Sequence, residues 1–203
     1  MHFGNTMHII IVPLGSSRSV YYSAGVRDSL VSLVRSSSEF SFLTSVRQMR
    51  HNSGSLLSLR TADSRQMLEI QSSGRQDVLR LLYMTGAGLR VETFPLRLAD
   101  DSWHRLAVIV SGDQIEVRSR HRVTSNTDGD TWCLQVMLDC RSVHRRVVTR
   151  PDTSFQPDQG ELTAWLGQRN QDNFLFKVKL FSFKRVEVTS KGEGMGEIEN
   201  FMR

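Results

Sequence analysis

Cysteine, lysine and long apolar runs are all scarce in this 203-residue chain. Its two cysteines, Cys133 and Cys140, are too few for a dense disulfide framework or a four-ligand zinc site, and they leave open one local disulfide or two free thiols. No stretch reaches the roughly 18 apolar residues of a membrane-spanning helix, so we expect no membrane insertion. The short apolar segment near the start has no basic residue before it and makes a poor secretory signal.

Catalytic motifs are missing as well. The six histidines form no HExxH pair, and neither a Gly-x-Ser-x-Gly elbow nor a phosphate-binding loop occurs. Glu69 and Glu92 are the only acids in the middle of the early strand-like runs, and no strand carries the paired acids that glycoside hydrolysis needs. We therefore predict that the protein is not an enzyme and holds neither a cofactor nor a metal.

Arginine is what the chain has in excess, with 22 Arg against 4 Lys and a net charge of +5. The planar guanidinium group binds sulfate, phosphate or carboxylate in two-point geometry, so an arginine-rich surface suits a polyanion. Nucleic acid is disfavoured because the interleaved aromatic and basic residues of a stacking platform are absent. A merely solvated basic surface is the alternative that composition leaves open.

Hydrophobic periodicity separates a short helix from a long run of strands. Residues 23–35 have a helical pattern, and from residue 39 onward the period becomes two. Short aliphatic runs alternate with turns rich in Gly, Ser, Asp and Asn, which predicts a sandwich of two antiparallel sheets. The alternation slips near Leu180 and Phe181, where we expect a β-bulge. Trp103 and Trp165 lie in strand-like runs and are predicted to be core residues, with His104 on the face opposite Trp103.

Five stretches, in order along the chain, resemble the thrombospondin N-terminal domain of the laminin-G-like group, which thrombospondins, Nel-like proteins and some collagens carry. They are FSFLTSVRQMRHNSGSLLSL, LEIQSSG, WHRLAVIVSGDQIEV, MLDCRSVHRRVV and LGQRNQDNFLFKVKL, and the match covers about residues 20 to 188. The resemblance implies a concanavalin- or laminin-G-like jelly-roll sandwich with one short N-terminal helix. It also implies a secreted protein of the extracellular matrix, within a parent protein that can be oligomeric.

The resemblance divides the chain into an irregular segment 1–20, a sandwich domain 21–188 and a flexible tail 189–203. Residues 118–136 stand where the family has little between two strands, so we interpret them as an inserted loop. Within them, residues 126–130 resemble a calcium loop, but Met137 stands where a bidentate acid is expected, and a plain turn is favoured. The family's usual partner of Cys140 is absent, which leaves Cys133 as the candidate for a disulfide.

A heparin site is the main functional implication of the resemblance. It falls on the basic turn at Arg47 and Arg50, and Arg27 and Arg35 of the predicted helix would add to it. Several guanidinium groups on one surface bind a sulfated chain by releasing its counterions. The predicted function is therefore an adhesion module that binds heparin or heparan sulfate and matrix or cell-surface proteins. The alternatives are a solvated turn and a structural protein–protein domain without affinity for glycans.

A second basic patch contains Arg141, Arg145 and Arg146. In a regular extended strand Arg141 and Arg145 share one face and Arg146 lies on the other, so the run cannot present all three to one surface unless it bends. A sheet edge protected by charge is the alternative explanation.

Overall fold

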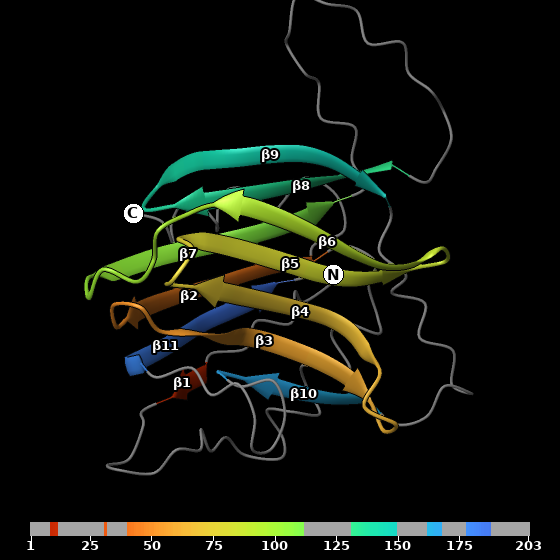
Figure 1. Ribbon diagram of the computed structural model, residues 1–203, viewed down its shortest axis with the longest axis horizontal. Coiled ribbons are helices and arrows are strands. Elements are labelled where there is room, and N and C mark those ends of the chain that lie inside the picture. Colours follow the sequence, from red (N-terminus) through yellow and green to blue (C-terminus); the bar gives the residue numbers. More distant parts are fainter. Residues whose placement is uncertain are drawn as a thin grey trace, which may run out of the picture.

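The computed structural model describes residues 9–11, 31, 40–111, 131–149, 162–167 and 178–187, most of them as β-strand. Sheet A consists of β1 (Ile9–Ile11), β2 (Phe40–Gln48), β7 (Trp103–Ser111), β8 (Thr131–Leu138), β9 (Arg141–Thr149) and β11 (Val178–Glu187). Sheet B consists of β3 (Ser53–Thr61), β4 (Gln66–Ser73), β5 (Val78–Thr85), β6 (Gly88–Pro95) and β10 (Leu162–Leu166). The strand order is β1-β11-β2-β7-β8-β9 in sheet A and β10-β3-β4-β5-β6 in sheet B (Figure 1).

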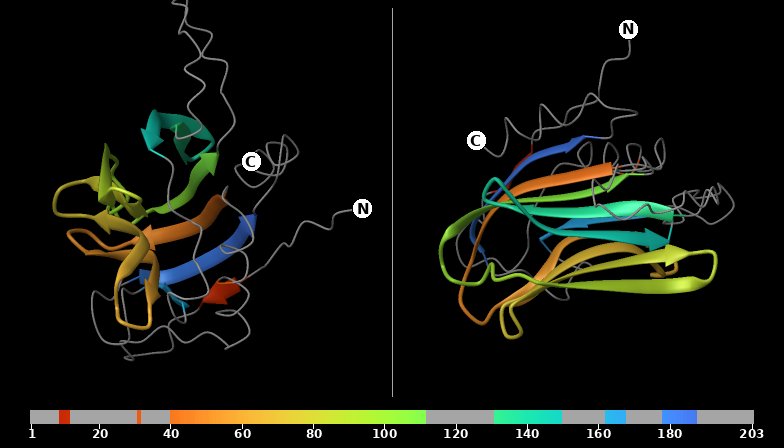
Figure 2. Two further views of the ribbon diagram at one scale, coloured as in Figure 1. Left: turned by 90° about the vertical axis from the view of Figure 1, so that its right-hand side faces the viewer. Right: turned by 90° about the horizontal axis from the view of Figure 1, so that it is seen from above.

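The two sheets form the layers of a sandwich, which the views in Figure 2 show from the side and from above. Each pairing between the described strands is antiparallel. The predicted jelly-roll sandwich of two antiparallel sheets is therefore confirmed. Of the predicted helix 23–35 only Val31 is described, and it packs against the core. The proposed segments 1–20 and 189–203 lie outside the described residues apart from β1, so those domain boundaries stay predictions.

Alternation of apolar and polar residues builds the core between the sheets. In β5, Leu79, Leu81 and Tyr83 are buried, while the residues between them are half-buried. In β2, which belongs to the opposite sheet, Phe42 and Val46 are fully buried. Strand β5 thus has the period-two burial expected of a sheet with one face in the core, whereas β3 and β4 each have six consecutive buried residues. The strands predicted after residue 39 are confirmed within the described residues.

Strand β8 begins at Thr131, inside the range predicted to be an inserted loop. Trp132, Leu134 and Val136 are buried in the core, and their alternation explains why this part is a strand. The remainder of the predicted loop, 118–130, lies outside the described residues, and so does the calcium loop considered at 126–130.

Two strands contain irregularities in register. The pairing of β11 with β2 shifts between Val178 and Leu180 and again between Phe183 and Arg185, which confirms the bulge expected near Leu180. The pairing of β8 with β9 shifts between Val136 and Met137. There β9 has one extra residue, so the faces of its side chains change over along the strand.

That shift in β9 corrects the expected geometry of the second basic patch. Arg145 pairs with Gln135, on the outward face of sheet A, whereas Arg141 pairs with Leu138 and Arg146 with Leu134 on the inward side. Arg141 and Arg145 therefore do not share a face, because the bulge between them reverses the alternation that a regular strand would have kept.

The disulfide considered between Cys133 and Cys140 is not formed. Cys133 is buried near the start of β8, and Cys140 is exposed in the turn after the same strand. An extended strand rises about 3.3 Å per residue, so it holds the two residues roughly 20 Å apart. A disulfide requires α-carbons within about 7 Å of each other.

Gly74 marks the place where three connections meet at one end of the sandwich. Its N–H donates a 2.8 Å hydrogen bond to the carbonyl oxygen of Asn52, in the turn between β2 and β3. A β-carbon added at Gly74 would collide with that carbonyl oxygen and with the side chain of Ala99, in the connection between β6 and β7. Only a residue without a side chain fits between these two neighbours.

We expect Gly74→Ala to lower the free energy of unfolding by about 1–3 kcal/mol, because the added methyl group meets fixed backbone. Gly86→Ala is the matched control, since an added β-carbon there meets nothing within 4 Å. Its effect should stay within about 0.5–1 kcal/mol. Urea denaturation of both variants measures the difference, and equal midpoints would contradict the packing described for Gly74.

Candidate functional site: a basic end of the sandwich

The basic turn joins β2 to β3 and has a rigid base. The N–H of Asn52 donates to the carbonyl oxygen of Met49 at 3.2 Å and closes the turn. The fully buried carboxamide of Gln48 donates to the carbonyl oxygen of Asn52 at 2.6 Å and accepts from the hydroxyl of Ser72 at 2.6 Å. Because the turn is fixed at its base, its exposed tip at residues 49–51 is held in one place.

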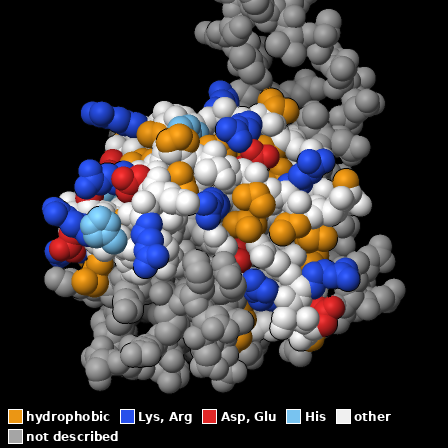
Figure 3. All heavy atoms as spheres, viewed as in Figure 1, with side chains coloured by type: hydrophobic (Ala, Val, Ile, Leu, Met, Phe, Trp, Pro, Cys, Tyr) orange, Lys and Arg blue, Asp and Glu red, His pale blue; other side chains and the backbone are white. Residues whose placement is uncertain are grey.

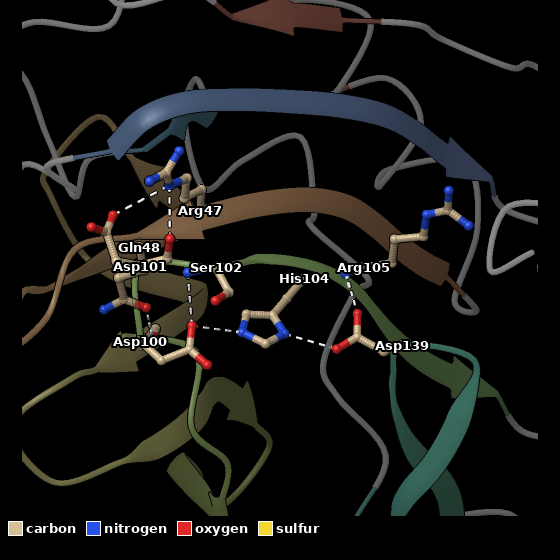
Figure 4. Close-up of polar contacts among 9 residues, drawn as sticks. Arg47, Gln48, Asp100, Asp101, Ser102, His104, Arg105 and Asp139 are labelled. Carbon is tan, nitrogen blue, oxygen red and sulfur yellow. Dashed lines mark hydrogen bonds and ion pairs between the residues drawn. The ribbon is translucent and has the colours of Figure 1, made fainter.

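Arg47 holds a neighbouring connection against this turn (Figure 4). Its Nε donates to the carbonyl oxygen of Asp101 at 2.8 Å and to the Oδ1 of the same residue at 3.2 Å. In return, the N–H of Asp101 donates to the carbonyl oxygen of Gln48 at 3.0 Å. Arg47 is therefore partly a structural residue, with its charge next to a carboxylate and about a third of its side chain exposed.

Four connections lie at this end of the sandwich, which we call the basic end: residues 49–52, 74–77, 96–102 and 139–140. They lie together because antiparallel strands return to the same edge, and the contacts of Gly74 join the first three directly. Figure 3 shows several basic side chains, with acidic ones among them, at the left end of the view, where Figure 1 places these connections; further basic side chains lie elsewhere on the same face. The exposed arginines at or next to the connections are Arg50, Arg75, Arg97 and Arg141.

The acids of the basic end are largely paired with other residues. Asp101 pairs with Arg47, while Asp100 and Asp139 both contact His104. Within the described residues, none of the four exposed arginines forms an ion pair. Asp77 and Asp139 remain exposed, so the four exposed arginines outnumber the exposed acids of these connections.

His104 lies between two carboxylates and ties two of the connections together (Figure 4). Its Nδ1 is 2.8 Å from the Oδ2 of Asp139, and its Nε2 is 3.0 Å from the Oδ1 of Asp100. Burial by itself lowers the pKa of His104, but the hydrogen bonds to Asp139 and Asp100 outweigh it, so the pKa is raised above its usual value of 6.5. Burial raises the pKa of Asp100, and its hydrogen bonds to His104 and to the Ser102 N–H outweigh that effect and lower it.

The backbone of the basic end is unusual in its dihedral angles. A non-glycine residue with φ between 46° and 68° occurs in each of three connections and twice in the fourth. Such angles are rare outside glycine, and residues that adopt them gather at functional sites. They are His51, Asp77, Asp101, Asp139 and Cys140.

The predicted site residues are only partly brought together. Arg50 is at the exposed tip of the basic turn and Arg47 supports it, whereas Arg27 and Arg35 lie outside the described residues. Arg75 and Arg97 were missed. Each is a single basic residue in a turn-like stretch, and only the strand order brings them next to the turn that contains Arg50.

The second basic patch is distributed over three places. Arg141 belongs to the basic end, and Arg145 lies on the outward face of sheet A. Arg146 contacts the edge strand of the other sheet, with Nη1 at 2.5 Å from the Oε2 of Glu92 and its guanidinium over the ring of Phe94 at 5.1 Å. Arg146 thus links the edge of sheet A to the edge of sheet B. The three arginines do not form one anion site.

The prediction that Trp103 is a core residue is wrong, because the residue is 48% exposed. It pairs with Arg47 on the outward face of sheet A, and His104 takes the inward position. The sequence therefore predicted that the two face opposite ways but assigned the wrong one to the core. Trp165 is half-buried.

Two features are absent from the described part of the chain, a cluster of metal ligands and a membrane-spanning helix. Within those residues, no group of three or more His, Cys, Asp or Glu side chains is placed to hold a metal ion. Among the same residues, no helix has the length and apolar character to cross a membrane.

Comparison with known proteins gives relatives in sequence and in fold, although no family model matches. Human protein kinase C-binding protein NELL1 is 33% identical over 160 residues, covering 79% of this chain and 17% of that protein. Protein NEL of Gallus gallus is 33% identical over 163 residues, covering 80% and 17%. The chain thus spans about 17% of the length of the curated relatives it matches.

Solved structures show the fold. The CBM40 domain of the Ruminococcus gnavus IT-sialidase, bound to α2,3-sialyllactose, superimposes with a TM-score of 0.58 over 97% of this chain and 95% of that one, at 11% identity. The leech intramolecular trans-sialidase superimposes with a TM-score of 0.55 over 98% of this chain and 27% of that one. At these identities the likeness concerns the fold alone.

Protonated His104 should stabilise the fold in a limited pH range. Because its pKa is raised in the folded state, its contribution is fully present below about pH 6.5 and is lost as the pH rises through the folded value. The contribution of Asp100, whose pKa is lowered, is lost only as the pH falls through its own folded value, below 3.8.

We therefore expect the difference in unfolding free energy between the parent and His104→Gln to be larger at pH 5.5 than at pH 9. Urea titrations of both proteins at each pH measure it, and comparison with the parent cancels the groups that the two proteins share. A difference that is constant across this range would contradict a charged imidazole between the two carboxylates.

Proposed function

We propose that this chain, a β-sandwich domain related to the Nel-like proteins, is an extracellular, non-enzymatic adhesion module that binds heparin or heparan sulfate through its basic end. The observation that carries the proposal is the set of four exposed arginines on connections that meet at one end. The relation to the Nel-like proteins supports a matrix-type module.

A sulfated chain fits this end for electrostatic reasons. Its negative charges repeat along its length, so several guanidinium groups at separate points of one surface bind it together and release its counterions. Arginine forms two-point hydrogen bonds with each anionic group, which adds geometry to the attraction. Since the aspartates nearby are largely engaged with Arg47 and His104, binding at Arg50 or Arg75 breaks no ion pair among the described residues.

Contact with a protein is the second candidate function, and a different surface supports it. On the outward face of sheet B, Leu89 and Val91 are 48% and 50% exposed. Their partners across the register, Met84 and Leu82, are half-buried, so the four side chains form one apolar patch. Exposed apolar patches of this kind are typical of protein–protein contacts, and NELL1 is itself named as a protein kinase C-binding protein.

Retention on immobilised heparin tests the glycan proposal. We expect the 203-residue chain to be retained at low salt, and the double variant Arg50→Ala with Arg75→Ala to elute at clearly lower salt. The slope of log affinity against log salt should fall by about 2 in magnitude, because two ionic contacts are lost.

Arg65→Ala with Arg90→Ala is the matched control, since it removes two exposed arginines from the opposite end and changes the net charge equally. Its elution should stay close to that of the parent. Equal shifts in both double variants would mean that net charge alone governs retention. A parent that is not retained would remove the glycan proposal and leave the protein contact.

A further inference from the structure

Trp103 is an exposed aromatic residue at the margin of the basic end. It is the first residue of β7 and directly follows the 96–102 connection. A large apolar side chain left in solvent is more informative than a buried one, because tryptophan is highly buried on average. We therefore consider Trp103 a candidate for contact with a ligand.

The position of Trp103 is fixed relative to Arg47. The two residues are direct partners across the antiparallel pair β2–β7, where β-carbons lie about 4.5–5.5 Å apart. Asp101 accepts hydrogen bonds from Arg47 through its carbonyl and carboxylate oxygens. It stands two residues before Trp103 in the chain. The two side chains thus start from neighbouring positions on the outward face of sheet A.

The surroundings of Trp103 indicate what kind of partner it accepts. On the same face, the next cross-strand pair is Ser45 with exposed Arg105. An isolated aromatic ring among cationic and hydroxyl groups is unlike the apolar patch at Leu89 and Val91, which suits a protein. It matches a ligand with an apolar face and acidic substituents, and a pyranose ring of an acidic glycan has both.

We propose that Trp103 and Arg47 form a stacking subsite for one sugar ring of an acidic glycan bound along the basic end. The inference rests on the function proposed above and names a contact that adds a non-ionic contribution to glycan binding. The C–H groups of the ring lie on the negative face of the indole. Within the described residues Arg47 donates only through its Nε, so the terminal N–H groups of its partly exposed side chain can bind the sulfate or carboxylate of that ring.

The salt dependence of heparin binding separates stacking from charge. An ionic contact changes the slope of log affinity against log salt, whereas a stacking contact changes the affinity by a similar factor at every salt concentration. We expect Trp103→Ala to weaken binding to a heparin oligosaccharide about tenfold, in the range of measured aromatic stacking contacts, with the slope unchanged. Arg50→Ala should instead reduce the slope by about 1.

Two further variants complete the experiment. Trp103→Phe keeps an aromatic face and should retain most of the affinity, and Val91→Ala, at a residue of similar exposure on sheet B, should bind as the parent does. Addition of the oligosaccharide should change the tryptophan fluorescence of the parent and leave that of Trp103→Phe unchanged. Urea midpoints equal to that of the parent would show that the exposed substitutions leave the fold intact.

The outcomes distinguish the two proposals. If the parent binds heparin and Trp103→Ala binds equally well, the stacking subsite is wrong and the basic end remains. If Trp103→Ala lowers the slope, the residue acts by positioning arginines rather than by stacking. If the parent does not bind heparin at all, both proposals fall together.

Discussion

The buried carboxamide of Gln48 is the interaction on which the basic end depends. It satisfies the carbonyl oxygen of Asn52 and the hydroxyl of Ser72, while the backbone oxygen of Gln48 accepts from the N–H of Asp101. One residue therefore joins the end of β2 to the turn that follows it, to β4 and to the 96–102 connection. Loss of the amide would leave the buried hydroxyl of Ser72 without this acceptor, which costs more than the hydrogen bond itself contributes, while the carbonyl oxygen of Asn52 would keep the N–H of Gly74. The exposed arginines keep their positions because a satisfied polar network holds the backbone beneath them.

The sheet architecture could be read from the sequence because it depends on local patterns. Period-two runs bounded by turn residues identify strands such as β5, and the slip near Leu180 identifies a bulge. The site could be read only where one segment contains it, as at Arg50. Arg75 and Arg97 join it through strand order, which no local window of sequence contains. Trp103 shows the same limit, because an alternating pattern states that Trp103 and His104 face opposite ways without saying which way is inward.

The predicted faces of the β9 arginines were wrong for a related reason. A single extra residue in the strand reverses the faces of everything beyond it, so the pairing of Arg141 with Arg145 fails although each residue lies in the expected strand. Cys133 and Cys140 were considered as a pair because they are close in sequence, and the extended strand separates them. For the arginines the strand was predicted correctly and the geometry within it was not, whereas Cys133 belongs to a strand that begins inside the predicted loop.

The distribution of ion pairs decides which arginines can bind an anion at low cost. Arg146 would have to leave Glu92 and the ring of Phe94, and full use of Arg47 would release Asp101 and loosen the connection that it holds. Arg50, Arg75 and Arg141 have no such partner among the described residues, so an incoming anion only replaces water around them. The internal pairs also weaken the repulsion between Asp100, Asp101 or Asp139 and the ligand. Arg47 and His104 therefore reduce the repulsion that Asp100, Asp101 and Asp139 exert on an anion, while the exposed arginines still outnumber the exposed Asp77 and Asp139.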